Sequence, residues 1–128
     1  MARYLHTSIF VNDMQATIDF YTQELGLKLL DGPLHYPGNA DMAFVGASWD
    51  AYIELVYDLE EHAPYAIGNR YEHLAVEVDG DLAALCERLR SRGYPVKGPK
   101  KSPGGGRSIA FTEDPNGIPV ELLEPRRT

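Results

Sequence analysis

The stretches RYLHTSIFV (residues 3–11) and RYEHLAVEV (residues 70–78) are two copies of one pattern, and they lie 67 positions apart. Sliding the chain on itself by this offset superposes eleven identical pairs, whereas about three or four are expected by chance. The pairs are Arg3/Arg70, Tyr4/Tyr71, His6/His73, Val11/Val78, Ala16/Ala83, Gly26/Gly93, Gly38/Gly105, Ala43/Ala110, Phe44/Phe111, Glu54/Glu121 and Leu55/Leu122. The sequence therefore predicts a duplicated unit.

The first copy is predicted to contain one strand, one helix and three further strands. In residues 3–11 the alternation of side chains places His6, Ser8 and Phe10 on one face of a strand. Asn12 or Asp13 can cap a helix that ends at Gly26. The inward stripe of this helix is Met14, Ile18, Tyr21 and Leu25, and strands are expected near residues 27–30, 42–46 and 52–57.

The second copy repeats this order with a strand at 71–78 and a helix that ends near Gly93. Its inward helical stripe is Leu82, Leu85, Cys86 and Leu89, so Cys86 is expected to pack in the core rather than act as a nucleophile. Strands near 95–97, 107–112 and 118–123 complete it, the last one entered through the turn Asp114-Pro115-Asn116-Gly117. The fold class expected is α+β, with two tandem β-α-β-β-β modules that form curved mixed sheets.

Length and composition limit the function classes. A chain of 128 residues is expected to form one domain, 1–128, made of repeats at about 1–60 and 68–126, because a half of about 60 residues is marginal alone. A net charge of −7 argues against nucleic-acid or anionic-membrane partners. A single cysteine and no signal-like or membrane-spanning apolar run predict a reduced, cytoplasmic setting.

The matched His6/His73 and Glu54/Glu121 pairs indicate a metal site. Alone, each glutamate could be a salt-bridge or edge-strand residue, and each histidine an ordinary imidazole. Together they supply two imidazoles and two carboxylates, all on corresponding strands, which suits one divalent ion. Such a donor set leaves two positions of an octahedral ion for water or for substrate oxygens. The two modules are therefore expected to surround a metal site.

Motifs along nearly the whole chain resemble glyoxalase I of the vicinal oxygen chelate superfamily. They are LHTSIFVNDMQATIDFYTQELGLKLL at the start, MAFVG, YIELVY, RYEHLAVEV, and IAFTEDPNGIPVELLE at the end. The resemblance implies that His6, Glu54, His73 and Glu121 are the metal ligands. Relatives that use two histidines and one glutamate differ from this set, and bleomycin-binding relatives generally lack it.

The resemblance implies a reaction and a cofactor. The family isomerises the hemithioacetal of methylglyoxal and glutathione to S-lactoylglutathione by proton transfer through a metal-bound cis-enediolate. Glu121 would be the base, and Glu54 its partner ligand in catalysis. The short chain is similar to the bacterial type, for which nickel or cobalt is implied and zinc is the alternative. A homodimer is implied, with the metal at the subunit interface, although both half-sites could also close within one chain.

The chain departs from the family where glutathione is recognised. Phe10 stands where the family usually has an arginine, and Asp58 where it has an asparagine, and neither replaces a cation for a carboxylate. Other cations could compensate, namely Arg70 and the Lys97, Lys100, Lys101 and Arg107 of the segment KGPKKSPGGGR. This segment could be a flap over an anionic thiol conjugate, although a solvated connection is the commoner role of such lysines.

Two other functions stay open. One is another metalloenzyme of the same superfamily, acting on a different thiol or carbonyl substrate. The other is a non-catalytic ligand-binding protein on the same scaffold. Metal analysis distinguishes the second of these from both enzymes.

Overall fold

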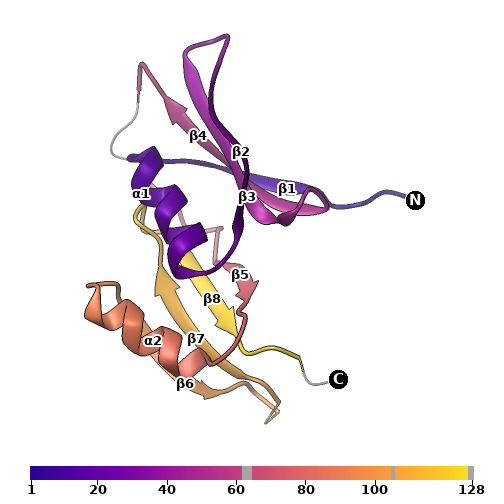
Figure 1. The fold of residues 1–128 in the computed structure, drawn as a ribbon, viewed down its shortest axis with the longest axis vertical. Helices are drawn as coiled ribbons and strands as arrows, with labels where there is room; N and C mark the ends of the chain where they lie inside the picture. Colours follow the sequence, from indigo (N-terminus) through magenta and orange to yellow (C-terminus); the bar gives the residue numbers. More distant parts are fainter. Residues whose placement is uncertain (62–64, 105, 127–128) are drawn as a thin grey trace. The chain divides into compact units, whose positions relative to one another are not determined.

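The computed structural model describes residues 1–61, 65–104 and 106–126, and the chain divides into two compact units. These are Met1–Ala66 and Ile67–Thr128, and each contains a strand, a helix and three further strands in that order (Figure 1). The predicted α+β class and the β-α-β-β-β order of both modules are confirmed.

The first unit is built on a four-stranded mixed sheet with the order β1-β4-β3-β2. Strand β1 is parallel to β4, and the other neighbours are antiparallel. The elements are β1 (His6–Phe10), α1 (Met14–Asp19), a π-helical segment η1 (Phe20–Glu24), β2 (Lys28–Tyr36), β3 (Ala40–Ser48) and β4 (Ala51–Asp58).

The second unit repeats this topology in the order β5-β8-β7-β6, again with one parallel pair, β5 and β8. Its elements are β5 (Leu74–Glu77), α2 (Leu82–Ser91), β6 (Val96–Lys101), β7 (Ser108–Glu113) and β8 (Pro119–Leu123). No helix in the described part of the chain is long and apolar enough to cross a membrane.

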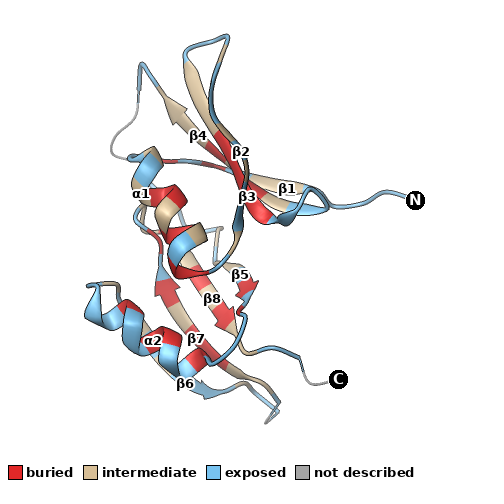
Figure 2. Cartoon of the chain, viewed as in Figure 1, coloured by how far each residue is buried: buried red, intermediate tan, exposed pale blue. Residues whose placement is uncertain are grey.

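In both units the helix packs on one face of the sheet, and the side chains of the central strands alternate (Figure 2). In β4, Ile53 and Leu55 are buried, whereas Glu54 between them is only half-buried. In β8, Val120 and Leu122 are buried in the same way around Glu121. The buried residues are apolar, so burial of their surface stabilises the sheet against the helix. Both glutamates therefore lie on the face opposite the core.

The first helix differs from the prediction, because the expected single helix to Leu25 changes its hydrogen-bonding pattern after Asp19. Segment η1 is π-helical, and the Leu25 amide donates to the Phe20 carbonyl at 3.1 Å, five residues earlier. The wider turn allows Phe20 and Tyr21, which are consecutive, both to be fully buried. Apolar periodicity alone does not reveal this insertion.

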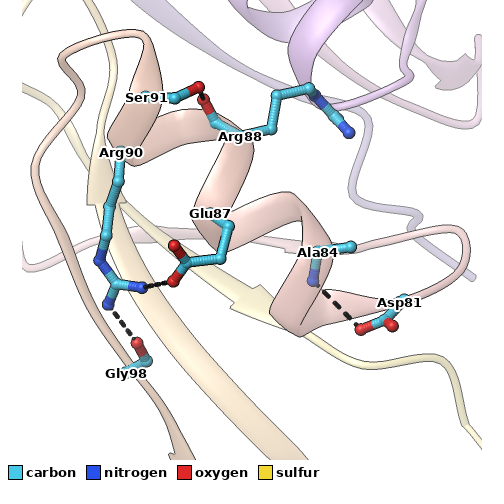
Figure 3. A network of polar contacts seen from close by, with 7 residues as sticks. All are labelled: Asp81, Ala84, Glu87, Arg88, Arg90, Ser91 and Gly98. Atoms are coloured by element: carbon cyan, nitrogen blue, oxygen red, sulfur yellow. Dashed lines mark hydrogen bonds and ion pairs between the residues drawn. The ribbon is translucent and has the colours of Figure 1, made fainter.

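Helix α2 follows the prediction closely, and its four inward residues are all buried. Asp81 caps it by accepting a hydrogen bond of 3.2 Å from the Ala84 amide (Figure 3). Near the other end, Arg90 donates to Glu87 and to the Gly98 carbonyl, which ties the helix to β6. Cys86 is fully buried, and burial is the main cause that raises the pKa of its thiol. The prediction of a core role for Cys86 is confirmed.

Several strand predictions were wrong in their bounds, among them the strand expected at 71–78, which begins only at Leu74. Strand β2 runs on to Tyr36 because it pairs with β3 in a hairpin. Strand β6 extends to Lys101, where the prediction ended it at residue 97, because Lys100 and Lys101 pair with Ile109 and Ser108 of β7. The polar composition of this segment hid a strand whose exposed side chains face water.

Candidate functional site

His6 and Glu54 form a pair in the first unit. His6 begins β1 and Glu54 lies on the neighbouring β4, with the imidazole Nε2 3.6 Å from the carboxylate Oε2. Their side chains are 34% and 20% exposed, so a ligand in solution can reach them. The two strands are parallel, with Ser8 of β1 opposite Glu54. This register brings the His6 side chain close to the Glu54 carboxylate.

Both members of this pair are supported by neighbours on the same sheet face. The Ser8 hydroxyl donates to the second carboxylate oxygen of Glu54, Oε1, at 3.1 Å. The His6 ring stacks on Tyr52 with the centroids 4.8 Å apart. Tyr52 in turn contacts Trp49 and Phe44 edge-on. An aromatic cluster therefore fixes the plane of the imidazole, and a hydroxyl fixes the carboxylate.

His73 and Glu121 form the corresponding pair in the second unit. His73 directly precedes β5, Glu121 lies on β8, and Nε2 is 3.4 Å from Oε1. The other ring nitrogen, Nδ1, lies 3.0 Å from the Glu72 carboxylate, and Phe111 packs edge-on against the ring. The Glu72 contact favours the tautomer that leaves Nε2 without a proton, which is the form that binds a metal.

The residues present fit a divalent metal. Each unit offers one imidazole nitrogen and one carboxylate within 4 Å of each other, on a partly exposed face. In the first unit, Nδ1 of His6 is buried, whereas Nε2 faces the Glu54 carboxylate, so Nε2 is the ring atom that could bind an ion. Within the described ranges, no group of three or more His, Cys, Asp or Glu side chains is gathered in one place. Each pair thus offers two donor groups, fewer than the four that a tetrahedral ion takes.

Phe10 and Asp58 lie beyond the first pair on the same side of the sheet. Phe10 is 52% exposed and stacks on Tyr65 at 5.1 Å. Asp58 accepts hydrogen bonds from the Glu60 and Glu61 amides, so its carboxylate organises the chain after β4. The pKa of Tyr65 is raised by desolvation first, and then by Asp58 and Glu61, so the phenol stays neutral. The surroundings of Phe10 are therefore aromatic and acidic.

The predicted cations of the second unit are placed differently from a loop flap. Lys97, Lys100 and Lys101 lie on β6, and directly after it the Ser102 amide donates to the Arg107 carbonyl. Arg107 pairs with Glu77 at 2.5 Å and donates to the Glu124 carbonyl. Arg70 is exposed before β5. Arg107 is therefore committed to an ion pair in its own unit.

The side chains that support the two His–Glu pairs were not predicted from the sequence. Ser8 was placed on the face of His6, but no role was predicted for Ser8, Tyr52 or Glu72. The contact between Ser8 and Glu54 depends on the strand register, and the register follows only once β1 is known to pair with β4 in parallel. Glu72 precedes the second histidine directly, and that adjacency was the one signal available in the sequence.

The chain was compared with known proteins. Residues 3–122 match the model of the glyoxalase/bleomycin resistance protein/dioxygenase superfamily. The lactoylglutathione lyase of Salmonella typhimurium is 42% identical over 97% of this chain and 93% of its own length.

Two solved structures are also similar. Glyoxalase I from Zea mays has a TM-score of 0.85 and 32% identity over 98% of this chain, which spans only 46% of the maize chain. The trypanothione-dependent glyoxalase I of Leishmania major has a TM-score of 0.79 and 30% identity, with 97% of this chain and 87% of that chain covered. The chain therefore belongs to the glyoxalase/bleomycin resistance protein/dioxygenase superfamily, and within it to the glyoxalase I (lactoylglutathione lyase) family of enzymes.

Proposed function

We propose that this enzyme isomerises the hemithioacetal of methylglyoxal and glutathione to S-lactoylglutathione. The observation that carries the proposal is the pair of His–Glu contacts at corresponding positions, 3.6 Å in one unit and 3.4 Å in the other. Two equivalent half-shells of this kind are what a single shared ion requires. The lactoylglutathione lyase relatives support the choice of reaction.

In this proposal a divalent ion is held by four side chains, His6 and Glu54 together with His73 and Glu121. Nickel or cobalt is proposed, with zinc as the alternative. We further propose a homodimer, in which His6 and Glu54 of one subunit meet His73 and Glu121 of the partner subunit. The donor count supports a shared site, because two protein ligands per unit leave a shell incomplete.

The bound ion would stabilise negative charge on the two oxygens of the substrate, which lowers the cost of removing a proton from the neighbouring carbon. The protein's part is then the transfer of that proton. Glu121 accepts it from C1 and returns it to C2, so the aldehyde-derived carbon becomes the thioester and the ketone carbon becomes the alcohol. Glu54 stays in place as the counterpart ligand.

An assay with reconstituted metal tests the proposal. The metal-free protein is loaded with nickel, cobalt or zinc, and formation of the thioester from methylglyoxal and glutathione is followed. Turnover with at least one ion, together with loss of bound metal in His6→Ala and Glu54→Ala, is the expected result. Unchanged metal content in both variants would show that the site is assigned to the wrong residues.

A second candidate, favoured by a specific observation, is the same isomerisation with a thiol other than glutathione. The face next to the His6–Glu54 pair presents the Phe10–Tyr65 stack and the Asp58 carboxylate, and Arg107 is paired with Glu77. Strand β1, which carries Phe10, contains no lysine or arginine that could bind an anionic glutamyl group. The Leishmania relative is described as trypanothione-dependent, so this family includes an enzyme with another thiol.

A comparison of thiols distinguishes the two candidates. Hemithioacetals of methylglyoxal are prepared with glutathione, with its glutamyl-free dipeptide cysteinylglycine, and with a thiol that carries extra amino groups. If glutathione gives the highest kcat/KM, the first candidate holds. If removing the glutamyl group or adding positive charge raises kcat/KM, the second candidate holds. Stoichiometric metal without turnover for any thiol would favour another metalloenzyme of the superfamily that acts on a different substrate.

A further inference from the structure

We propose that Ser8 is a positioning residue that fixes Glu54 as the stationary carboxylate ligand, so that Glu121 is left as the carboxylate free to move. This inference rests on the proposed function, because it assumes that both glutamates bind one ion. It adds a structural reason, in a residue outside the ligand set, why Glu54 and not the chemically identical Glu121 stays in place.

The geometry divides the two oxygens of Glu54 between two partners. Oε1 accepts the hydrogen bond from the Ser8 hydroxyl at 3.1 Å, and Oε2 faces the His6 imidazole at 3.6 Å. Rotation of the carboxylate away from His6 would break the hydroxyl bond. The serine therefore holds the Oε2 oxygen on the side of the imidazole, where a shared ion would be bound.

The second unit lacks this support. Its register places Ala75 opposite Glu121, just as Ser8 lies opposite Glu54 in the first unit. An alanine side chain has no hydroxyl to donate. The remaining contact of Glu121 in this half-site is its Oε1 approach to His73 at 3.4 Å. The glutamate assigned as the base is thus the one whose strand neighbour cannot restrain it.

This difference matches what the reaction asks of the two carboxylates. A base must swing between C1 and C2 of the substrate, and each hydrogen bond that it has to break adds to the barrier. A stationary ligand gains from such a bond, and removing a group that orients a ligand commonly lowers metal affinity about 10- to 100-fold. Because Ser8 is exposed, we expect the lower end of this range.

Two reciprocal substitutions test the proposal. Ser8→Ala removes the hydroxyl beside Glu54, and Ala75→Ser installs one beside Glu121, where the exposed Ala75 side chain leaves room. Ser8→Thr keeps a hydroxyl and serves as the rescue variant. Nickel affinity is measured by competition with a chromophoric chelator, and kcat and KM are measured at saturating metal.

Ser8→Ala should weaken nickel binding roughly tenfold, and Ser8→Thr should restore most of it. Ala75→Ser should bind nickel at least as tightly as the wild type while kcat falls several-fold with KM little changed. If Ser8→Ala binds nickel like the wild type, or if it loses affinity only in proportion to a lower thermal stability, Ser8 is a packing residue and the proposal is wrong.

The same data separate this inference from the proposed function. If the wild type binds nickel but does not isomerise the hemithioacetal, the proposed function fails, and the affinities of the Ser8 variants still decide the role of the serine. If the wild type binds no divalent ion, both fail. If turnover is normal and Ser8→Ala is indistinguishable from wild type, only the inference about Ser8 fails.

Discussion

The two half-sites share one backbone plan but are supported in opposite ways. In the first unit the carboxylate is held by Ser8, and the imidazole stacks on Tyr52. In the second unit the imidazole is held through Nδ1 by Glu72. The residues at positions matching Ser8 and Tyr52 are Ala75 and Pro119, which offer neither a hydroxyl nor an aromatic ring. The two His–Glu pairs are therefore equal in residue type but differ in the side chains that support them.

The same contrast continues further along the first strand of each unit. Phe10 and Glu77 occupy equivalent positions, but Phe10 stacks on Tyr65, whereas Glu77 binds Arg107. One unit thus has an apolar aromatic surface where the other has an ion pair. A substrate that contacts both would meet two different chemical environments, which a symmetric duplicated site could not provide.

The largest effect is expected from replacing the two glutamates separately. Glu121→Gln keeps the shape but removes the base, so kcat should fall by about 10³-fold or more, while some metal is retained. Glu54→Gln should act mainly on metal affinity and lower kcat at saturating metal much less. Steady-state kinetics and metal analysis of both variants check this. Wild-type-like turnover in Glu121→Gln would refute the assignment of the base.

A mixing experiment asks whether the two half-sites meet between subunits. One variant carries His6→Ala and Glu54→Ala, the other His73→Ala and Glu121→Ala, and each should be inactive alone. In the proposed homodimer, a mixed dimer contains one intact set of four ligands. Random exchange after unfolding and refolding of an equal mixture should therefore restore about a quarter of the wild-type activity.

The control for this experiment is each variant mixed with itself and refolded in the same way. If the mixture stays inactive while size-exclusion chromatography shows a dimer, the half-sites close within one chain. A monomer would exclude the proposed interface site directly. Either outcome keeps the four ligands and changes only which chain supplies them.

Phe10 offers a smaller and more specific effect. Phe10→Arg introduces a cation next to the His6–Glu54 pair, and a charge-assisted bond of about 1.5 kcal/mol would lower KM for the glutathione substrate roughly tenfold. Phe10→Leu removes the aromatic stack on Tyr65 without adding charge and serves as the control. An unchanged KM in Phe10→Arg would indicate that the glutamyl group is bound elsewhere.

The sequence was informative where one pattern repeats and weak where strands must be paired. Alternation correctly placed His6, Ser8 and Phe10 on one face of β1, because a half-buried strand has a period of two residues. The inward positions of α2 were found because a helix that buries one face has a period of 3.6 residues. The role of Ser8 could not be found this way, because it depends on which strand lies beside β1. The π-helical turn at Phe20 depends on packing of two adjacent aromatic rings, which periodicity does not describe.

The smallest effects are expected from substitutions at the N-caps of the two helices, one in each unit. They compare how much each helix cap contributes to the free energy of unfolding. Asp13 accepts from the Ala16 amide at 2.9 Å, and Asp81 accepts from the Ala84 amide at 3.2 Å. Asp→Ala at either position should lower the free energy of unfolding by about 1 kcal/mol, and Asp→Asn, which keeps a capping oxygen, by less. The expected drop in Tm is roughly 4 °C, measured by circular dichroism.

If residues 1–128 fold as one domain, as expected from the length of the chain, both alanine variants keep a single unfolding transition, since destabilising one unit lowers the stability of the whole. Two separate transitions in either variant would show that each unit unfolds alone.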